Sequence, residues 1–249
     1  MLRPEQRSKL DDTNDLDFYD APRFVTHVDD SFIDRLTNLY QSQLQPNTRI
    51  LDLMSSWVSH LPEMELAHVE GHGMNEKELA KNPQLDHYFV QNLNQNPKLP
   101  LKDADFDAVL ITVSIQYLQY PEAILSEIYR ILKPNGVVII SFSNRMFYQK
   151  AIAAWRDGTD TDRVNLVKKY FQSVDGFTQP EVIVHQSPVP GLLQMLGMAG
   201  GDPFYAVIAR KSDWGVGEKN VWSTGRVLNI FPSRLKALSS SNGIFIFKF

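Results

Sequence analysis

Hydrophobic and polar positions between residues 101 and 142 form blocks that predict a strand, a helix, a turn and a second strand. An apolar run at residues 108–112 predicts the first strand, and Pro121 starts a helix whose isoleucines recur at helical spacing, at positions 124, 128 and 131. The sequence KPNG then predicts a turn, and the β-branched run at residues 137–142 predicts a strand that is buried on both faces. Such strands belong to parallel sheets that helices cover on both sides, so the pattern indicates an α/β fold.

The same kind of pattern continues on either side of this block. Asp29 and Ser31 offer N-cap oxygens to a helix that extends to about residue 43, with Phe32, Leu36 and Tyr40 on one side. Further strands are predicted at residues 49–53, 66–70, 86–91, 181–185 and 204–209, and further helices at residues 75–81, 147–155 and 161–171.

Three stretches of the sequence resemble a known family. LPLKDADFDAV, SIQYL and RILKPNGVVIISFSNR are similar to the region from the fourth to the fifth strand of class I S-adenosylmethionine (SAM) dependent methyltransferases, the type 11 branch in particular. The resemblance extends from about residue 19 to residue 211, and SSWVSH and NRMFYQKAIAAW are similar to a group of plant and cyanobacterial members. It implies a Rossmann-like methyltransferase fold with a mostly parallel seven-stranded sheet, helices on both faces and an antiparallel last strand. It also implies SAM as cofactor and a small-molecule or lipid-like methyl acceptor.

Composition narrows the classes of protein and of partner. A chain of 249 residues with 43% hydrophobic residues can bury one sizeable core, which favours one domain with extensions. The resemblance implies that this is a methyltransferase domain at residues 18–211. The net charge of −4 gives no broad basic surface, so a nucleic-acid substrate is disfavoured. The chain has no cysteine, which excludes disulfides, thiolate nucleophiles and cysteine metal sites, and we expect no metal.

The two ends of the chain differ from the rest. Residues 1–17 are polar, carry four aspartates and predict a disordered, acidic arm. They lack the apolar core of a secretory signal, and no apolar run approaches about 18 residues, so we expect a cytoplasmic protein, or a plastid one in a photosynthetic eukaryote, without a transmembrane segment. Residues 212–249 carry a charge of +3, from five basic and two acidic residues, and are either an interaction segment or sequence without a role.

The loop after the first strand, residues 53–60, carries the first cofactor candidates. In open α/β sheets a ligand binds outside the carboxyl ends of the strands. Related methyltransferases read DxGxGxG here, and the glycines let the backbone approach the methionine part of SAM. This chain keeps Asp52 and has Ser55 and Ser56 in place of glycines. We expect their hydroxyls to donate to the cofactor carboxylate at the start of a helix, although the same serines can simply cap that helix.

The loops after the second, third and fourth strands supply the other cofactor candidates. The resemblance places an acidic ribose acceptor at Gly73, so that acceptor is missing unless His72 or a backbone carbonyl replaces it, because Glu70 points to the opposite face. It places Asn92 at the adenine amino group, where an amide oxygen still accepts, although asparagine is also an ordinary turn residue. The remaining candidates are Met74, Asn75, Leu93, Thr112 and Val113.

The stretch DFYDAPRF is similar to the N-terminal lid of type 11 enzymes. Within it, Tyr19 is predicted to face the sulfonium cation and Arg23 to bind the cofactor carboxylate as a planar fork. The alternative is that these aromatic residues only staple the following helix.

Methyl transfer is an in-line displacement that positioning and desolvation can drive, with a base to take a proton from the acceptor. Histidine suits that role near neutral pH, which makes His60, at the end of the first loop, and His27 the candidates, although a lone histidine is commonly structural. Tyr117 is the third catalytic candidate. With Asn144 and Arg145, it is expected on the side of the site where the methyl acceptor binds.

Two other classes of protein compete with this interpretation. A catalytically inactive methyltransferase-like scaffold or binding protein is the alternative, because three of the usual cofactor determinants are altered. A nicotinamide dehydrogenase ranks last, since no GxGxxG follows the first strand.

Overall fold

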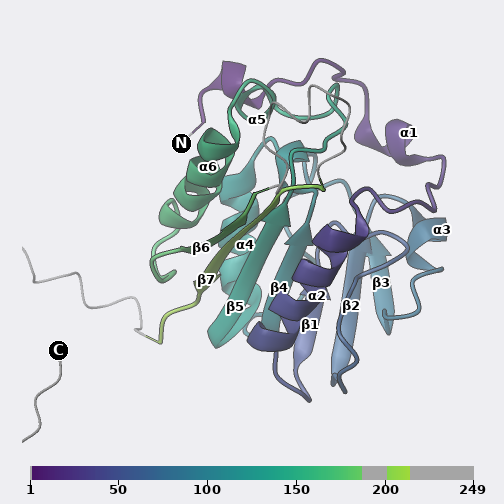
Figure 1. Cartoon of the computed structure of the whole chain (residues 1–249), viewed down its shortest axis with the longest axis vertical. Helices are drawn as coiled ribbons and strands as arrows, with labels where there is room; N and C mark the ends of the chain where they lie inside the picture. The colour runs from purple at the N-terminus through teal and green to yellow at the C-terminus, as the bar shows by residue number, and fades with distance from the viewer. Residues whose placement is uncertain (1, 187–200, 214–249) are drawn as a thin grey trace, which may run out of the picture. The chain divides into compact units, whose positions relative to one another are not determined.

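The computed structural model describes residues 2–186 and 201–213, in which seven strands form one sheet in the order β3-β2-β1-β4-β5-β7-β6 (Figure 1). Strands β1 to β5 pair in parallel, and β7 runs antiparallel to both β5 and β6. This arrangement confirms the expected mostly parallel sheet with an antiparallel last strand. The strands are β1 (Arg49–Asp52), β2 (His68–Gly73), β3 (His87–Val90), β4 (Phe106–Thr112), β5 (Leu132–Phe142), β6 (Glu181–His185) and β7 (Phe204–Arg210).

Local sequence signals start the longer helices. The side chain of Asp29 accepts from the Phe32 amide at the start of α2, Pro121 occupies the first turn of α4, and Thr159 forms a capping box with Asp162 at the start of α6. The helices of the described residues are η1 (Pro4–Arg7), α1 (Asp15–Tyr19), α2 (Asp30–Gln43), α3 (Glu76–Leu79), η2 (Ile115–Tyr117), α4 (Pro121–Ile131), α5 (Ala153–Arg156) and α6 (Asp160–Gln172). None of them is long and apolar enough to cross a membrane.

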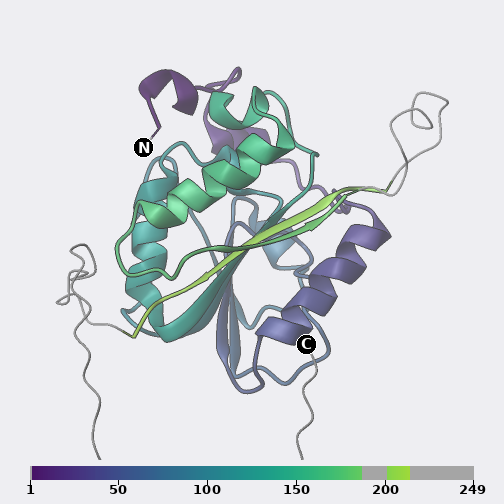
Figure 2. The same ribbon diagram turned by 60° about the vertical axis from the view of Figure 1, so that its left-hand side comes forward.

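Helices cover both faces of the sheet. Helix α2 packs on one face, and α4, α5 and α6 pack on the other (Figure 2). Successive strand residues point to opposite faces, so the buried run of β5 serves both cores: Ile139 joins the α2 side, and Ile140 joins the side that contains Trp155. The apolar run in the sequence is therefore continuous because both faces are covered.

Two predicted helices differ from the structure. Residues 147–152 form turns, and only α5 remains of the helix expected at 147–155. No helix follows β1 either, because residues 53–67 contain only turns and bends. Side chains satisfy the backbone there in place of helical bonds: Thr37 donates to the His60 carbonyl, Asn82 to the Ser56 carbonyl, and Gln84 bonds the amide and carbonyl of Leu61.

Residues 4–17, expected to be a disordered arm, instead contain η1 and the start of α1 and pack on the domain. The fully buried Nζ of Lys150 lies 3.1 Å from Asp11 and 3.4 Å from Asp15, and the Nζ of Lys9 lies 2.6 Å from Asp15. Two of the four aspartates that predicted solvation are thus partners of a lysine far along the chain. The C-terminal tail that was predicted to be distinct lies outside the described residues from position 214 onward.

Candidate functional site

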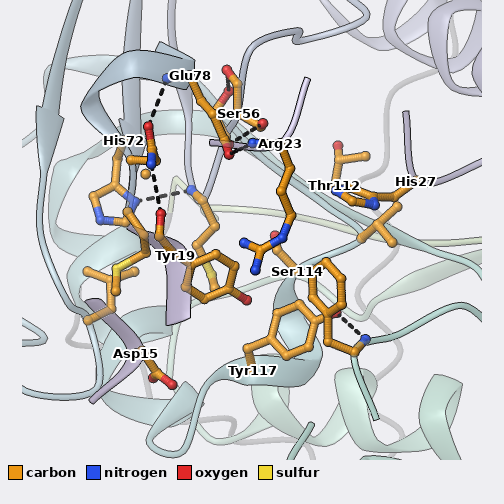
Figure 3. A pocket seen from close by; sticks show the side chains of 18 of the residues that line it. Asp15, Tyr19, Arg23, His27, Ser56, His72, Glu78, Thr112, Ser114 and Tyr117 are labelled. Atoms are coloured by element: carbon orange, nitrogen blue, oxygen red, sulfur yellow. Dashed lines mark hydrogen bonds between the residues drawn. The ribbon is translucent and has the colours of Figure 1, made fainter. Parts of the chain in front are cut away.

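A cavity of about 560 Å³ lies at the carboxyl ends of β1 to β5, with residues from the N-terminal segment (residues 2–27) on its wall (Figure 3). Its volume is in the usual range for a site that binds a small molecule or cofactor. The loops that the sequence singled out therefore meet around one space. The predicted cofactor residues that line it are Tyr19, Arg23, Ser55, Ser56, Gly73, Met74, Asn75, Asn92, Leu93, Thr112 and Val113.

Asp52 does not line this cavity but lies beside the first loop, where it lines a smaller hollow of about 80 Å³. Its carboxylate is 4% exposed and accepts from the Ser55 hydroxyl at 2.5 Å. Burial raises the pKa of Asp52 from 3.8 to about 6, while bonds from Ser55 and Ser59 oppose that rise. Asp52 therefore stabilises the first loop from outside the cavity. It can affect cofactor binding only by positioning Ser55.

The two serines of the first loop bond to carboxylates of the chain. Ser55 donates its hydroxyl to Asp52, and Ser56 donates its hydroxyl to Glu78 at 2.6 Å. The Ser55 amide donates to the His72 carbonyl at 2.6 Å. Since each hydroxyl hydrogen is engaged, both serines present lone pairs to the cavity. The expected helix N-terminus behind them is absent.

His72, in β2, bonds to the loops after β1 and β3 and was considered from the sequence only as a substitute ribose acceptor. Its Nδ1 accepts from the Met54 amide at 3.1 Å, and its Nε2 lies 2.9 Å from the Gln91 carbonyl, which fixes the neutral tautomer with the proton on Nε2. Burial lowers the pKa of His72 to about 4, so the ring is neutral at physiological pH. Both ring nitrogens already make hydrogen bonds, so His72 links β2 to the loops after β1 and β3 and stabilises their positions.

Gly73 lies where the first loop approaches β2 closely. A Cβ atom at this position would lie 2.7 Å from the Ser55 carbonyl oxygen, a distance that requires the loop to move. A carboxylate that lines the cavity is Glu78, which the sequence did not single out. Its Oε1 accepts from the Arg23 amide at 2.6 Å and its Oε2 accepts from Ser56, so it joins the N-terminal segment to the first loop. Glu70 bonds to His68 and His87 and does not line the cavity.

The two asparagines among the cofactor candidates already make local bonds. Asn75 caps α3 through the Glu78 amide and donates to the carbonyls of Tyr19 and Asp20, at 2.7 and 2.8 Å. The Oδ1 of Asn92 accepts from the Asn94 amide at 3.0 Å, which is an Asx turn. Asn92 is thus the turn residue that its type favours, with one lone pair left toward the cavity.

Aromatic rings surround the Arg23 guanidinium in the cavity (Figure 3). Its Cζ lies 4.7 Å from the ring centre of Phe18, 5.7 Å from that of Tyr19 and 5.5 Å from that of Phe147. Nη2 donates to the Phe18 carbonyl at 2.9 Å, and the buried Nη1 has no hydrogen-bond partner in the part of the chain that the structure describes. A cation with an unpaired donor, held against rings, is a site for an anionic group of a ligand.

The three catalytic candidates separate in the structure. His27 and Tyr117 line the cavity, whereas His60 lines the smaller hollow and has a left-handed backbone with φ of 55°. Partial burial lowers the pKa of His27, and burial raises the pKa of Tyr117. The Tyr117 hydroxyl accepts from the Phe147 amide at 2.9 Å, so its own proton remains available to a ligand. Asn144 and Arg145 also line the cavity.

Comparison with known proteins adds to this geometry. The methyltransferase domain model matches residues 61–140. A demethylmenaquinone methyltransferase of Streptomyces avermitilis is 50% identical over 48 residues, which are 19% of this chain and 21% of that protein, so the chain spans about a fifth of the curated relative. A SAM-dependent methyltransferase from Archaeoglobus fulgidus superimposes with a TM-score of 0.49 at 15% identity over 72% of this chain and 92% of that chain. The [4+2]-cyclase SpnF superimposes with a TM-score of 0.48 at 16% identity over 72% and 81%.

The sheet order and the cavity at its carboxyl edge define an α/β protein with a Rossmann-like methyltransferase fold. The segment that matches the methyltransferase domain model includes β2 to β4 and most of β5. This part of the chain is therefore similar in sequence to methyltransferase domains.

Proposed function

We propose that the chain transfers a methyl group from SAM to a small-molecule or lipid-like acceptor. The observation that carries the proposal is the cavity at the carboxyl ends of β1 to β5, where the loops singled out from the sequence meet. A fold of this type hosts several functions, so the proposal depends on the side chains of the cavity.

Those side chains fit the chemistry of SAM, a sulfonium cation that carries an adenosine and an amino acid. The Nη1 of Arg23, which has no partner among the described residues, can bind a carboxylate, and the rings of Tyr19 and Phe147 that hold the guanidinium also line the cavity. Lone pairs of Ser55 and Ser56 and the polar wall formed by Asn92 are left for hydroxyl and amino groups.

When bound, SAM supplies an electrophilic methyl group for an in-line displacement. The residues of the chain then have to hold the acceptor, exclude water and take up a proton. We assign proton acceptance to His27, because it lines the cavity and its lowered pKa keeps it neutral, and not to His60, which lies outside the cavity. The Tyr117 hydroxyl, kept protonated by its raised pKa, donates to the acceptor.

Replacing Arg23 by methionine tests the cofactor assignment. We expect calorimetry to show that S-adenosylhomocysteine binds the native chain and that Arg23→Met weakens this binding about tenfold, because a charge-assisted bond to the carboxylate is lost. Binding of adenosine, which has no carboxylate, should change less than about twofold. The control is Arg35→Met on the exposed surface of α2, which should leave both affinities unchanged. Equal weakening of both ligands by Arg23→Met would show that Arg23 only supports the fold.

One observation favours the alternative of a methyltransferase-like scaffold without catalysis. The first loop is closed by its own bonds to Asp52, His72 and Glu78, and no helix follows it. In that case neither SAM nor S-adenosylhomocysteine should bind at millimolar concentration.

A further inference from the structure

Asp15 places a buried carboxylate on the wall of the cavity (Figure 3). It is 8% exposed, and its Oδ2 accepts from Lys9 Nζ at 2.6 Å and from Asn94 Nδ2 at 2.9 Å. Its Oδ1 is buried and has no hydrogen-bond partner among the described residues. A buried carboxylate oxygen without a donor is costly, so a ligand that brings an N–H or O–H group would be favoured here.

The cation that lies near this oxygen does not satisfy it. Lys150 Nζ lies 3.4 Å from Asp15 Oδ1, but it has three nearer acceptors: the Thr13 carbonyl at 2.9 Å, Asp11 Oδ2 at 3.1 Å and Thr13 Oγ1 at 3.2 Å. An ammonium group has three hydrogens, which these three acceptors use. Lys150 therefore balances the charge of Asp15 and leaves its Oδ1 free to accept.

The position of Asp15 in the cavity indicates which part of a ligand it meets. Asn94 donates to Asp15, and Asn92 Nδ2 lies 3.4 Å from Asn14 Oδ1, so the N-terminal segment closes directly over the loop after β3. The Oδ1 of Asn92 is already used by the Asn94 amide. Asp15 is consequently the stronger free acceptor at this end of the cavity, since a carboxylate oxygen accepts more strongly than an amide oxygen that already has a donor.

We propose that Asp15 accepts a hydrogen bond from the 6-amino group of the adenine of SAM and so selects an adenine-containing ligand. This inference rests on the proposed function and assigns to the N-terminal segment a specificity role that the loop after β3 was expected to hold alone. If the inference holds, a ligand that has a carbonyl oxygen in place of the 6-amino group should bind less well. Its oxygen and the Asp15 carboxylate are both acceptors, so no hydrogen bond can form between them.

The test compares S-adenosylhomocysteine with S-inosylhomocysteine, which has an oxygen in place of the 6-amino group, by calorimetry on the full chain. The native chain should bind the adenine ligand at least about tenfold more tightly. In Asp15→Asn, Lys9 and Asn94 still donate to the Oδ2 position, so the carbonyl oxygen of asparagine takes that place and its NH2 group faces the cavity. The preference should then disappear or reverse.

Asp11→Asn is the matched control, because Asp11 contacts the same lysine and does not line the cavity. It should leave the ratio of the two affinities unchanged even if it weakens the segment. An unchanged ratio in Asp15→Asn, or an equal change in both variants, overturns the inference while the proposed function stands. Absence of any binding of S-adenosylhomocysteine to the native chain overturns the proposed function and the inference with it.

Discussion

Replacing Gly73 by aspartate is expected to weaken the binding of S-adenosylhomocysteine about a hundredfold, although it restores the acidic residue that related methyltransferases have at this position. The added Cβ would lie 2.7 Å from the Ser55 carbonyl oxygen and 3.1 Å from the side chain of Leu79. The Ser55 amide bonds to the His72 carbonyl at 2.6 Å, so the loop cannot move away without breaking that bond. The loss of the loop position then outweighs any new bond from the carboxylate.

The variant Gly73→Ala distinguishes the effect of the added Cβ atom from the effect of the added carboxylate charge. Calorimetry should show most of the same loss in the alanine variant, because the Cβ is the cause. The control is Gly158→Ala, where the new Cβ would lie 3.1 Å from the Ala154 carbonyl, away from the cavity, and where we expect binding to be unchanged. If Gly73→Asp bound S-adenosylhomocysteine more tightly than the native chain, the prediction would be wrong. The first loop would then move at little cost, and the new carboxylate would act as the ribose acceptor that the site lacks.

Replacing Asp52 by asparagine is expected to change how stability depends on pH. Burial raises the pKa of Asp52 from 3.8 to about 6, so between these values the unfolded chain is ionised and the folded chain is protonated. The folded state then binds more protons, and the free energy of unfolding falls as pH rises through this window. The fall amounts to about 3 kcal/mol by pH 7, since one pKa unit corresponds to about 1.4 kcal/mol. The asparagine variant lacks this loss of stability with rising pH, but its side-chain oxygen still accepts a hydrogen bond from Ser55.

Urea unfolding followed by circular dichroism at several pH values between 4 and 7 measures this effect. The stability of Asp52→Asn relative to the native chain should rise with pH. The control is Asp162→Asn: bonds from Thr159 lower the pKa of Asp162 below 3.8, so the stability difference of this variant should stay nearly constant between pH 4 and 7. A difference between Asp52→Asn and the native chain that stays constant with pH would contradict the buried, loop-supporting position of Asp52.

The fold and the position of the cavity could be predicted from the sequence. The run that ends in β5 predicted a parallel, doubly covered sheet, and the topology of such a sheet brings the loops after β1 to β4 together. Tyr19 and Arg23 were placed on the cavity wall by resemblance, and both line it. The fold and the position of the cavity follow from local periodicity and from the order of elements, whereas Tyr19 and Arg23 follow from the resemblance alone.

Much of the bonding inside the site could not be predicted, because several of the partners lie far apart in the sequence. The hydroxyl of Ser56 was expected to face a cofactor, and its partner Glu78 is 22 residues further along the chain. Asp15 was placed in a disordered arm on composition alone, and its neighbour Lys150 follows β5. Helix propensity after β1 was overridden by side chains of Thr37, Asn82 and Gln84 that bond the loop backbone.

A crystal structure of the chain with S-adenosylhomocysteine tests the central claim most directly: a crevice without the usual glycines and ribose acceptor still binds an adenosyl group. We expect the adenine beside Asp15 and Asn92, the carboxylate on Arg23, and the bonds of Ser55 and Ser56 to Asp52 and Glu78 preserved. A cavity closed by the side chains of Met54 and Trp57, with no ligand at millimolar concentration, would contradict the account.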